Sequence, residues 1–211
     1  MNIIIRGADL YSPPTSEMPS GGVLYRTGRR IRGRLKAGVS LTDFEKRNIL
    51  IGEVGEAAVM ADFKRRGYDV RFLSWEEFKT KFVNETATDL IVKKGQLQQQ
   101  VQVKASENGN RAIRDYNLLN YERSKIDLIT FVAVMELDDP EDETGKGRCF
   151  ECQITSQVMP RHFREMKCWN RTSVGYQHSD NIDFIKDWQL TSARKGSKQI
   201  VTPSDVWELA I

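Results

Sequence analysis

The residues best suited to chemistry gather on one face of a predicted β-hairpin. Residues 97–105 alternate between polar and apolar types, which in a strand places the two types on opposite faces. Gln102 and Lys104 then share the polar face. Asp89 begins the preceding strand, so its carboxylate could converge with both across the hairpin. We therefore expect a carboxylate, an amide oxygen and an ammonium group in one site.

Such a group suits the metal-assisted hydrolysis of a phosphodiester. Mg²⁺ takes one or two carboxylates, keeps several waters and binds phosphate oxygens, and Mn²⁺ could substitute for it. The ion would lower the pKa of a bound water, and Lys104 would hold that water or stabilise charge in the transition state. The alternative is an ordinary solvent-exposed sheet face, because Gln and Lys are routinely exposed.

A predicted helix before the hairpin offers a second acidic ligand. Thr42 and Glu45 form a capping box, and a basic last turn followed by Gly67 ends the helical pattern. Glu53 and Glu56 lie one turn apart inside this helix. We expect Glu56 to bind the metal together with Asp89 and Gln102, with Glu53 as the alternative.

Two glycines interrupt the same helix. Gly52 and Gly55 each cost helix stability, so they require a reason such as close contact with another element or with a substrate backbone. The spacing predicts one apolar stripe along the helix, formed by Phe44, Ile51, Val54, Ala58 and Ala61.

The other elements follow from local patterns. We expect an irregular N-terminal segment, because proline and glycine pairs occur at 13–14 and 21–22. The segment from Lys167 to Ser197 is polar and is also expected to be irregular. Strands are predicted at 68–73, 127–137 and 148–155, and helices from Ser74, at 116–125, from about Pro160 to Met166, and near the end from Thr202.

The segment 26–36 is the strongest local source of positive charge. A flexible arm of arginine and glycine would suit phosphate contacts, because each guanidinium presents a planar fork to phosphate oxygens. The alternative is a solvated basic surface. The candidate contact residues are Arg26, Arg29, Arg30, Arg32, Arg34 and Lys36.

The three cysteines raise the question of zinc. Cys149, Cys152 and Cys168 could join His178 or His162 in a tetrahedral site. However, Cys149 and Cys152 also fall in a predicted strand, where they would point to opposite faces. Free cysteines are also common core residues. We therefore expect Mg²⁺ in preference to zinc, and a zinc site at these residues is the less favoured alternative.

Composition bounds the class of protein. The chain has 211 residues, a net charge of +3 and enough aromatic residues to form one core. Its longest apolar run is too short to cross a bilayer, and the apolar stretch among its first residues is too short to predict a signal peptide. We expect an intracellular protein, cytoplasmic or associated with the nucleoid.

In its order of motifs, the chain resembles the PD-(D/E)XK endonucleases. The resemblance covers about 42–166 and lies in Gly52-Glu53-Val54-Gly55-Glu56, Thr88-Asp89, Gln102-Val103-Lys104 and the hydrophobic strand from Ile126 to Val134. It implies a restriction-endonuclease-like central mixed β-sheet flanked by helices. It also implies Mg²⁺-dependent cleavage of DNA by Asp89, Gln102, Lys104 and Glu56. Gln102 replaces the usual acid, so metal affinity would depend more on Asp89 and Glu56.

We therefore expect a nuclease core over 42–166, a basic DNA-contacting segment over 1–41, and an extension over 167–211 that contacts DNA or mediates oligomerisation. The expected substrate is double-stranded DNA, cut site-specifically as by restriction or homing enzymes. A homodimer or higher homo-oligomer is expected, because cutting both strands needs two active sites. The alternatives are a non-catalytic nucleic-acid-binding module, an RNA-processing nuclease, and a plain structural or interaction domain.

Overall fold

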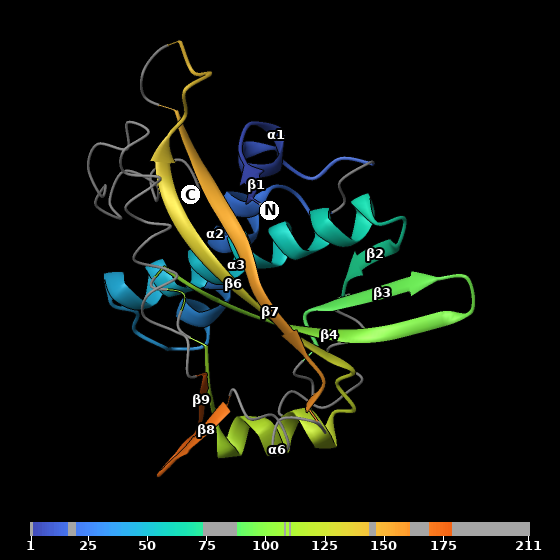
Figure 1. Ribbon diagram of the computed structural model, residues 1–211. Coiled ribbons are helices and arrows are strands. Elements are labelled where there is room, and N and C mark those ends of the chain that lie inside the picture. The colour runs from blue at the N-terminus through green and yellow to red at the C-terminus, as the bar shows by residue number, and fades with distance from the viewer. Residues whose placement is uncertain are drawn as a thin grey trace.

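A curled six-stranded sheet forms the centre of the molecule (Figure 1). The structure is a computed structural model that describes residues 2–16, 20–73, 88–107, 109, 111–143, 147–160 and 169–178. In chain order the elements are β1 (Asn2–Ile5), α1 (Ala8–Tyr11), α2 (Val23–Lys36), α3 (Asp43–Arg65), β2 (Asp69–Phe72), β3 (Leu90–Lys94), β4 (Leu97–Ser106), β5 (Ala112–Arg114), α6 (Asp115–Arg123), β6 (Leu128–Asp138), β7 (Arg148–Val158), β8 (Trp169–Thr172) and β9 (Gly175–His178).

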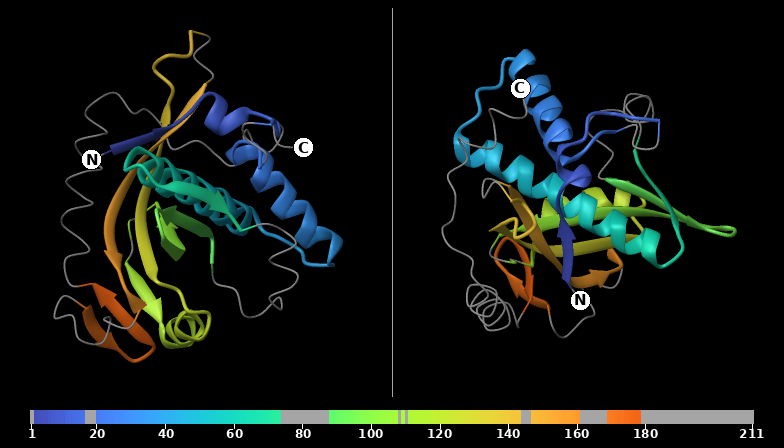
Figure 2. Two further views of the ribbon diagram at one scale, coloured as in Figure 1. Left: turned by 90° about the vertical axis from the view of Figure 1, so that its right-hand side faces the viewer. Right: turned by 90° about the horizontal axis from the view of Figure 1, so that it is seen from above.

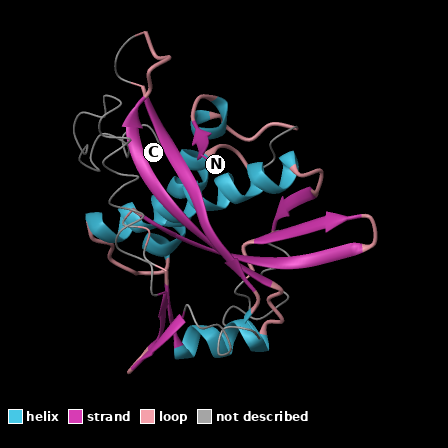
Figure 3. Ribbon diagram, in the orientation of Figure 1, coloured by secondary structure: helices cyan, strands magenta, loops and turns pink. Residues whose placement is uncertain are grey.

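The large sheet is mixed, as the sequence predicted. Its strand order is β1-β7-β6-β4-β3-β2, and a second sheet has the order β5-β9-β8. In the large sheet β4 and β6 are parallel, whereas the other neighbours are antiparallel. Parallel neighbours need a crossover, and the segment through β5 and α6 provides it (Figure 3). The fold is therefore mixed α/β with helices flanking the sheet.

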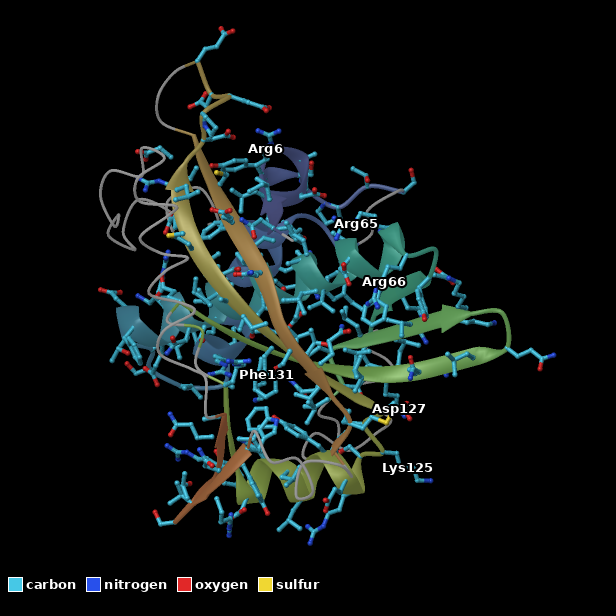
Figure 4. All side chains as sticks on the ribbon, viewed as in Figure 1. Arg6, Arg65, Arg66, Lys125, Asp127 and Phe131 are labelled. Atoms are coloured by element: carbon cyan, nitrogen blue, oxygen red, sulfur yellow. The ribbon has the colours of Figure 1, made fainter. Side chains whose placement is uncertain are left out.

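Helix α3 lies across one face of the large sheet, and α2 lies beside it (Figure 2). The main core forms between these helices and the apolar side of the strands, and it contains Leu50, Val54, Val103 and Val132. The opposite face is covered in part by α6 and the small sheet, where Phe131 and Trp169 pack with ring centroids 5.3 Å apart. Phe131 of β6 is labelled in Figure 4.

The prediction of an irregular N-terminal segment with a flexible basic arm is wrong. Residues 23–36 form a helix, and residues 2–5 form a strand of the central sheet. Val23, Leu24, Thr27 and Ile31 are buried at helical spacing, which anchors α2 despite its glycines. β1 pairs with β7 along its whole length. Residues 1–41 therefore include parts of the core fold.

Two further expectations require correction. Phe44 is 74% exposed and does not join the apolar stripe of α3, because the first residue of this helix to enter the main core is Leu50. The segment expected to be irregular after Lys167 contains the hairpin β8–β9, which the buried Trp169 attaches to Phe131.

Several other predictions have definite outcomes. The capping box of Thr42 and Glu45, the strand at 69–72 and the hairpin of β3 and β4 are confirmed. So are α6 and the strands β6 and β7. The predicted helices from Ser74, from about Pro160 to Met166 and near the C-terminus lie largely or wholly outside the described residues. Among the described residues, no helix combines the length and apolar character needed to cross a membrane.

Candidate active site

The β3–β4 hairpin brings Asp89 opposite Gln102. Leu90 pairs with Val101, and the tight turn is possible because Gly95 adopts a positive φ of 60°. Asp89 donates its backbone N–H to the Val101 carbonyl at 2.9 Å, which extends the pairing by one residue beyond β3. This backbone pairing thus fixes the position of the Asp89 Cα atom relative to β4.

The Asp89 carboxylate is held by β4. Its Oδ2 atom accepts the Val103 backbone N–H at 2.7 Å and the Gln102 side-chain amide at 2.5 Å. Gln102 is buried, with 8% of its surface exposed. The sequence prediction that Asp89 and Gln102 converge is therefore confirmed. The Asp89 carboxylate thus accepts the Val103 N–H, which would be available to a backbone carbonyl if β3 were longer.

The two glutamates of α3 have different partners. Glu53 accepts an N–H from Arg26 Nε on one oxygen at 2.6 Å, and its other oxygen forms an ion pair with Arg30 Nε at 3.0 Å. Glu56 is 5% exposed, and among the described residues its hydrogen-bonding partner is Arg30 Nη2, at the longer distance of 3.4 Å. Glu53 is thus committed to joining α2 and α3, which leaves Glu56 better suited to bind a metal.

Burial is the main cause of the raised pKa values of the carboxyl groups in this site. Burial raises the pKa of Asp89 to about 6, against the lowering effects of its hydrogen bond from Val103 and of the Arg30 and Lys104 charges. Burial, followed by the charges of Glu53 and Asp89, raises the pKa of Glu56 well above its usual range. A divalent cation between Asp89 and Glu56 would relieve this repulsion.

Gly55 allows α3 to approach β4 closely. A Cβ at position 55 would overlap the Ala105 methyl group and lie 3.5 Å from Val103 Cγ1. A Cβ at Gly52 would meet no heavy atom within 4 Å. Close contact with another element is therefore the reason for Gly55 but not for Gly52. The space beside Gly52 lies one helical turn from Glu56 on the same face.

Lys104 lies two residues after Gln102 and therefore projects from the same face of β4, away from Gly55 of α3 and toward Tyr121 of α6. Its Nζ lies 5.4 Å from the centre of the Tyr121 ring, a cation–π geometry. Burial lowers the pKa of Lys104, while the charge of Asp89 opposes that shift. Burial, then Asp89 and Tyr116, raises the pKa of Tyr121.

Sequence reasoning missed Tyr121. Its spacing from Leu118 marks both as buried residues of one helical face, and both are buried in the structure. That signal identifies a core residue, but it does not indicate that the ring lies against Lys104.

The donor set fits a hard cation such as Mg²⁺. Asp89 and Glu56 offer carboxylate oxygens. Gln102, expected as a third ligand, instead turns its amide N–H toward Asp89. Across the described part of the chain, no three His, Cys, Asp or Glu side chains stand close enough to hold a metal as a group. Two carboxylates with waters and substrate oxygens are nevertheless the usual requirement of Mg²⁺.

The basic residues of α2 divide into two groups. Arg26 is 7% exposed, so its proposed role as a DNA contact must be corrected: its guanidinium is used inside the protein by Glu53 and by the Gly21 carbonyl. Arg30 reaches the glutamates of α3 but remains partly exposed. The exposed residues that are free to form a basic surface are Arg29, Arg32, Arg34 and Lys36.

Two of the cysteines considered as zinc ligands lie in a strand, as the alternative in the sequence analysis predicted. Cys149 and Cys152 are buried in β7, three residues apart and therefore on opposite faces. Burial raises the pKa of Cys149 to about 11 and raises that of Cys152 further, which disfavours the thiolates that zinc needs. His178 ends β9, whereas Cys168 and His162 lie outside the described residues.

Comparison with known proteins gives no family for this chain: no protein-family model and no curated protein matches its sequence.

Proposed function

We propose that this protein is a Mg²⁺-dependent DNA endonuclease with a restriction-endonuclease-like fold. The observation that carries the proposal is the hydrogen bond from Gln102 to Asp89. The charge of Lys104 lowers the pKa of Asp89, and the charge of Asp89 raises the pKa of the buried Glu56, so both residues lie near this carboxylate. These residues come from three elements that the chain supplies in the order typical of PD-(D/E)XK enzymes. A central mixed sheet with the acidic helix on one face supports the same assignment.

Each residue has a separate task in the proposed reaction. Asp89 and Glu56 would bind the metal, and Gln102 would keep the Asp89 carboxylate oriented. The bound ion would neutralise the scissile phosphate and lower the pKa of a coordinated water. Lys104 would hold that water or donate to the oxygen on which negative charge develops. Tyr121 would fix the position of the Lys104 ammonium from the α6 side.

The proposed substrate is double-stranded DNA. The exposed residues Arg29, Arg32 and Arg34 of α2 would contact phosphates, which position a duplex without reading its sequence. The DNA-binding form would be a homodimer or higher homo-oligomer, because two active sites are needed to cut both strands.

A plasmid assay tests this function. Supercoiled DNA is incubated with the wild-type protein in Mg²⁺, in Mn²⁺ and in EDTA, beside Lys104→Ala and the control Lys94→Ala. Lys94 is a lysine of the same hairpin whose Nζ donates to the Arg66 carbonyl instead. We expect metal-dependent cleavage by wild type and Lys94→Ala and a loss of about 100-fold in Lys104→Ala.

The rival functions give different results in the same assay. If wild type and Lys104→Ala both bind DNA and neither cleaves it, the protein is a non-catalytic binding module. Metal-dependent cleavage of RNA in preference to DNA would indicate an RNA-processing nuclease. An absence of DNA affinity at every salt concentration would favour a structural domain.

A further inference from the structure

Arg30 joins the two buried glutamates of α3 from the solvent side. Its Nε lies 3.0 Å from one oxygen of Glu53, and its Nη2 lies 3.4 Å from Glu56 Oε1. The Arg30 side chain is 45% exposed, whereas those of Glu53 and Glu56 are 3% and 7% exposed. Arg30 is therefore the positive group that reaches Glu56 while remaining accessible to a ligand.

Arg26, one helical turn earlier, has a purely structural role and serves as a comparison for Arg30. Its guanidinium donates to the Glu53 side chain, the Glu53 carbonyl and the Gly21 carbonyl, and lies 4.2 Å from the centre of the Phe72 ring. Its side chain is 8% exposed. The contact between Arg30 and Glu56 is longer, at 3.4 Å, and its guanidinium is partly exposed to solvent, so Arg30 is less firmly held than Arg26.

A metal ion and Arg30 cannot both be close partners of Glu56 without cost. A divalent cation on this carboxylate would meet the guanidinium charge at the same oxygen, and like charges at short range repel. The Nε contact to Glu53 involves a different carboxylate and can persist. Metal binding would then release the Nη2 edge while the rest of the guanidinium stays beside the site.

We propose that Arg30 is the counter-ion of Glu56 in the metal-free protein and a ligand of the scissile phosphate in the loaded enzyme. This inference rests on the proposed nuclease function. A guanidinium held on one edge by a carboxylate presents its other donors to phosphate oxygens in a fixed fork. The ligand class is thus a phosphodiester already bound to the metal, which gains a partner when Glu56 gives up Arg30.

The test separates metal binding from cleavage. Mn²⁺ affinity is measured by calorimetry on the full chain without DNA, and single-turnover cleavage of a duplex is measured at saturating Mn²⁺. Arg30→Ala is expected to bind Mn²⁺ about five-fold more tightly, because a competing charge is gone. Cleavage by the same variant should fall about 100-fold, because the phosphate loses its partner.

Two further variants sharpen the outcome. Arg30→Lys keeps the charge but not the fork, so its Mn²⁺ affinity should stay near wild type while its cleavage still falls. Arg65→Ala removes an exposed arginine, labelled in Figure 4, that pairs with Asp62 at the C-terminal end of α3. This variant should change neither the Mn²⁺ affinity nor the cleavage rate. Thermal unfolding of each variant shows that it is folded before its affinity is compared.

The results distinguish this inference from the proposed function. Mn²⁺ binding by Arg30→Ala that is unchanged or weaker, beside an active wild type, overturns the inference and leaves the nuclease intact. Full cleavage by Arg30→Ala also overturns it. A wild type that cleaves no nucleic acid overturns the proposed function and the phosphate role together.

Discussion

Gln102 donates its side-chain amide to Asp89 Oδ2 at 2.5 Å, and the same nitrogen donates to the Val103 carbonyl at 2.9 Å. Because both partners are acceptors, the NH₂ group of Gln102 must face them. A glutamate could not donate to either when ionised. The neutral residue in the third motif position therefore stabilises the negative charge of Asp89 instead of adding to it.

Gln102→Glu should accordingly lower the stability of the metal-free protein and maintain or raise its affinity for the metal. In metal-free buffer the second buried carboxylate loses both hydrogen bonds and repels Asp89, so the free energy of unfolding should fall by about 2 kcal/mol or more. At pH 8 its Mn²⁺ affinity should equal or exceed that of wild type. Urea denaturation and calorimetry measure the two effects, with exposed Gln98→Glu on the same strand as control. Weaker Mn²⁺ binding by Gln102→Glu would contradict this account.

The glycines of α3 provide a matched pair of substitutions. Gly55→Ala should destabilise the protein by about 1–3 kcal/mol, because its Cβ overlaps Ala105 and α3 must move away from β4. Gly52→Ala has open space and should stabilise it by up to about 1 kcal/mol through helix propensity. Ala105→Gly should restore part of the loss in Gly55→Ala. Equal effects of the two single substitutions, measured by urea denaturation, would mean that α3 and β4 are not in close contact.

The raised pKa of Asp89 predicts a pH-dependent stability. Its folded pKa of about 6 exceeds an unfolded value of about 3.9, so the folded state binds the proton more tightly. In EDTA the free energy of unfolding should therefore fall as pH rises from about 4 to above 6. Asp89→Asn should match wild type near pH 3.5 and be about 1–3 kcal/mol more stable at pH 8. Chemical denaturation across this pH range measures the difference, and a difference that does not change with pH would contradict the assignment.

A second charged network joins α3 to the sheet away from the site. Arg47 is 7% exposed and donates to Glu107 and to Glu136 of β6. Arg47→Ala should cost about 3 kcal/mol of stability, because Glu136 is buried and loses its closest cation. Lys46→Ala removes only an exposed pair with Asp43 and should cost about 0.5 kcal/mol or less. Similar costs for the two variants in thermal or urea unfolding would show that the Arg47 network adds no stability.

Local patterns in the sequence were sufficient to predict the elements that carry the candidate site. The alternation after Gly95 predicts β4 and the convergence of Asp89 with Gln102, and the capping box of Thr42 and Glu45 predicts the start of α3. These features depend on neighbours along the chain or across a tight turn. The hairpin register could therefore be predicted without any knowledge of the tertiary structure.

Contacts between distant elements could not be predicted in this way. Arg30 and Glu56 are 26 residues apart and meet only because α2 packs beside α3. The basic composition of the segment around Arg30 obscured the apolar stripe that makes it a helix. Tyr121 reaches Lys104 only because α6 crosses the opposite face of the sheet. Long-range packing, which local pattern does not encode, decides these contacts.

The most direct test of the nuclease assignment is the single-turnover rate of duplex cleavage in Mg²⁺ by wild type, Asp89→Ala and Asp127→Ala. Asp127, labelled in Figure 4, is a matched control, because its carboxylate also accepts a backbone N–H of β4, from Gln100 at 2.8 Å, but it is exposed just before the start of β6. We expect Asp89→Ala to lose about 1,000-fold or more and Asp127→Ala to stay within about three-fold of wild type. Cleavage by Asp89→Ala at the wild-type rate would contradict the assignment and would mean that the active site lies elsewhere.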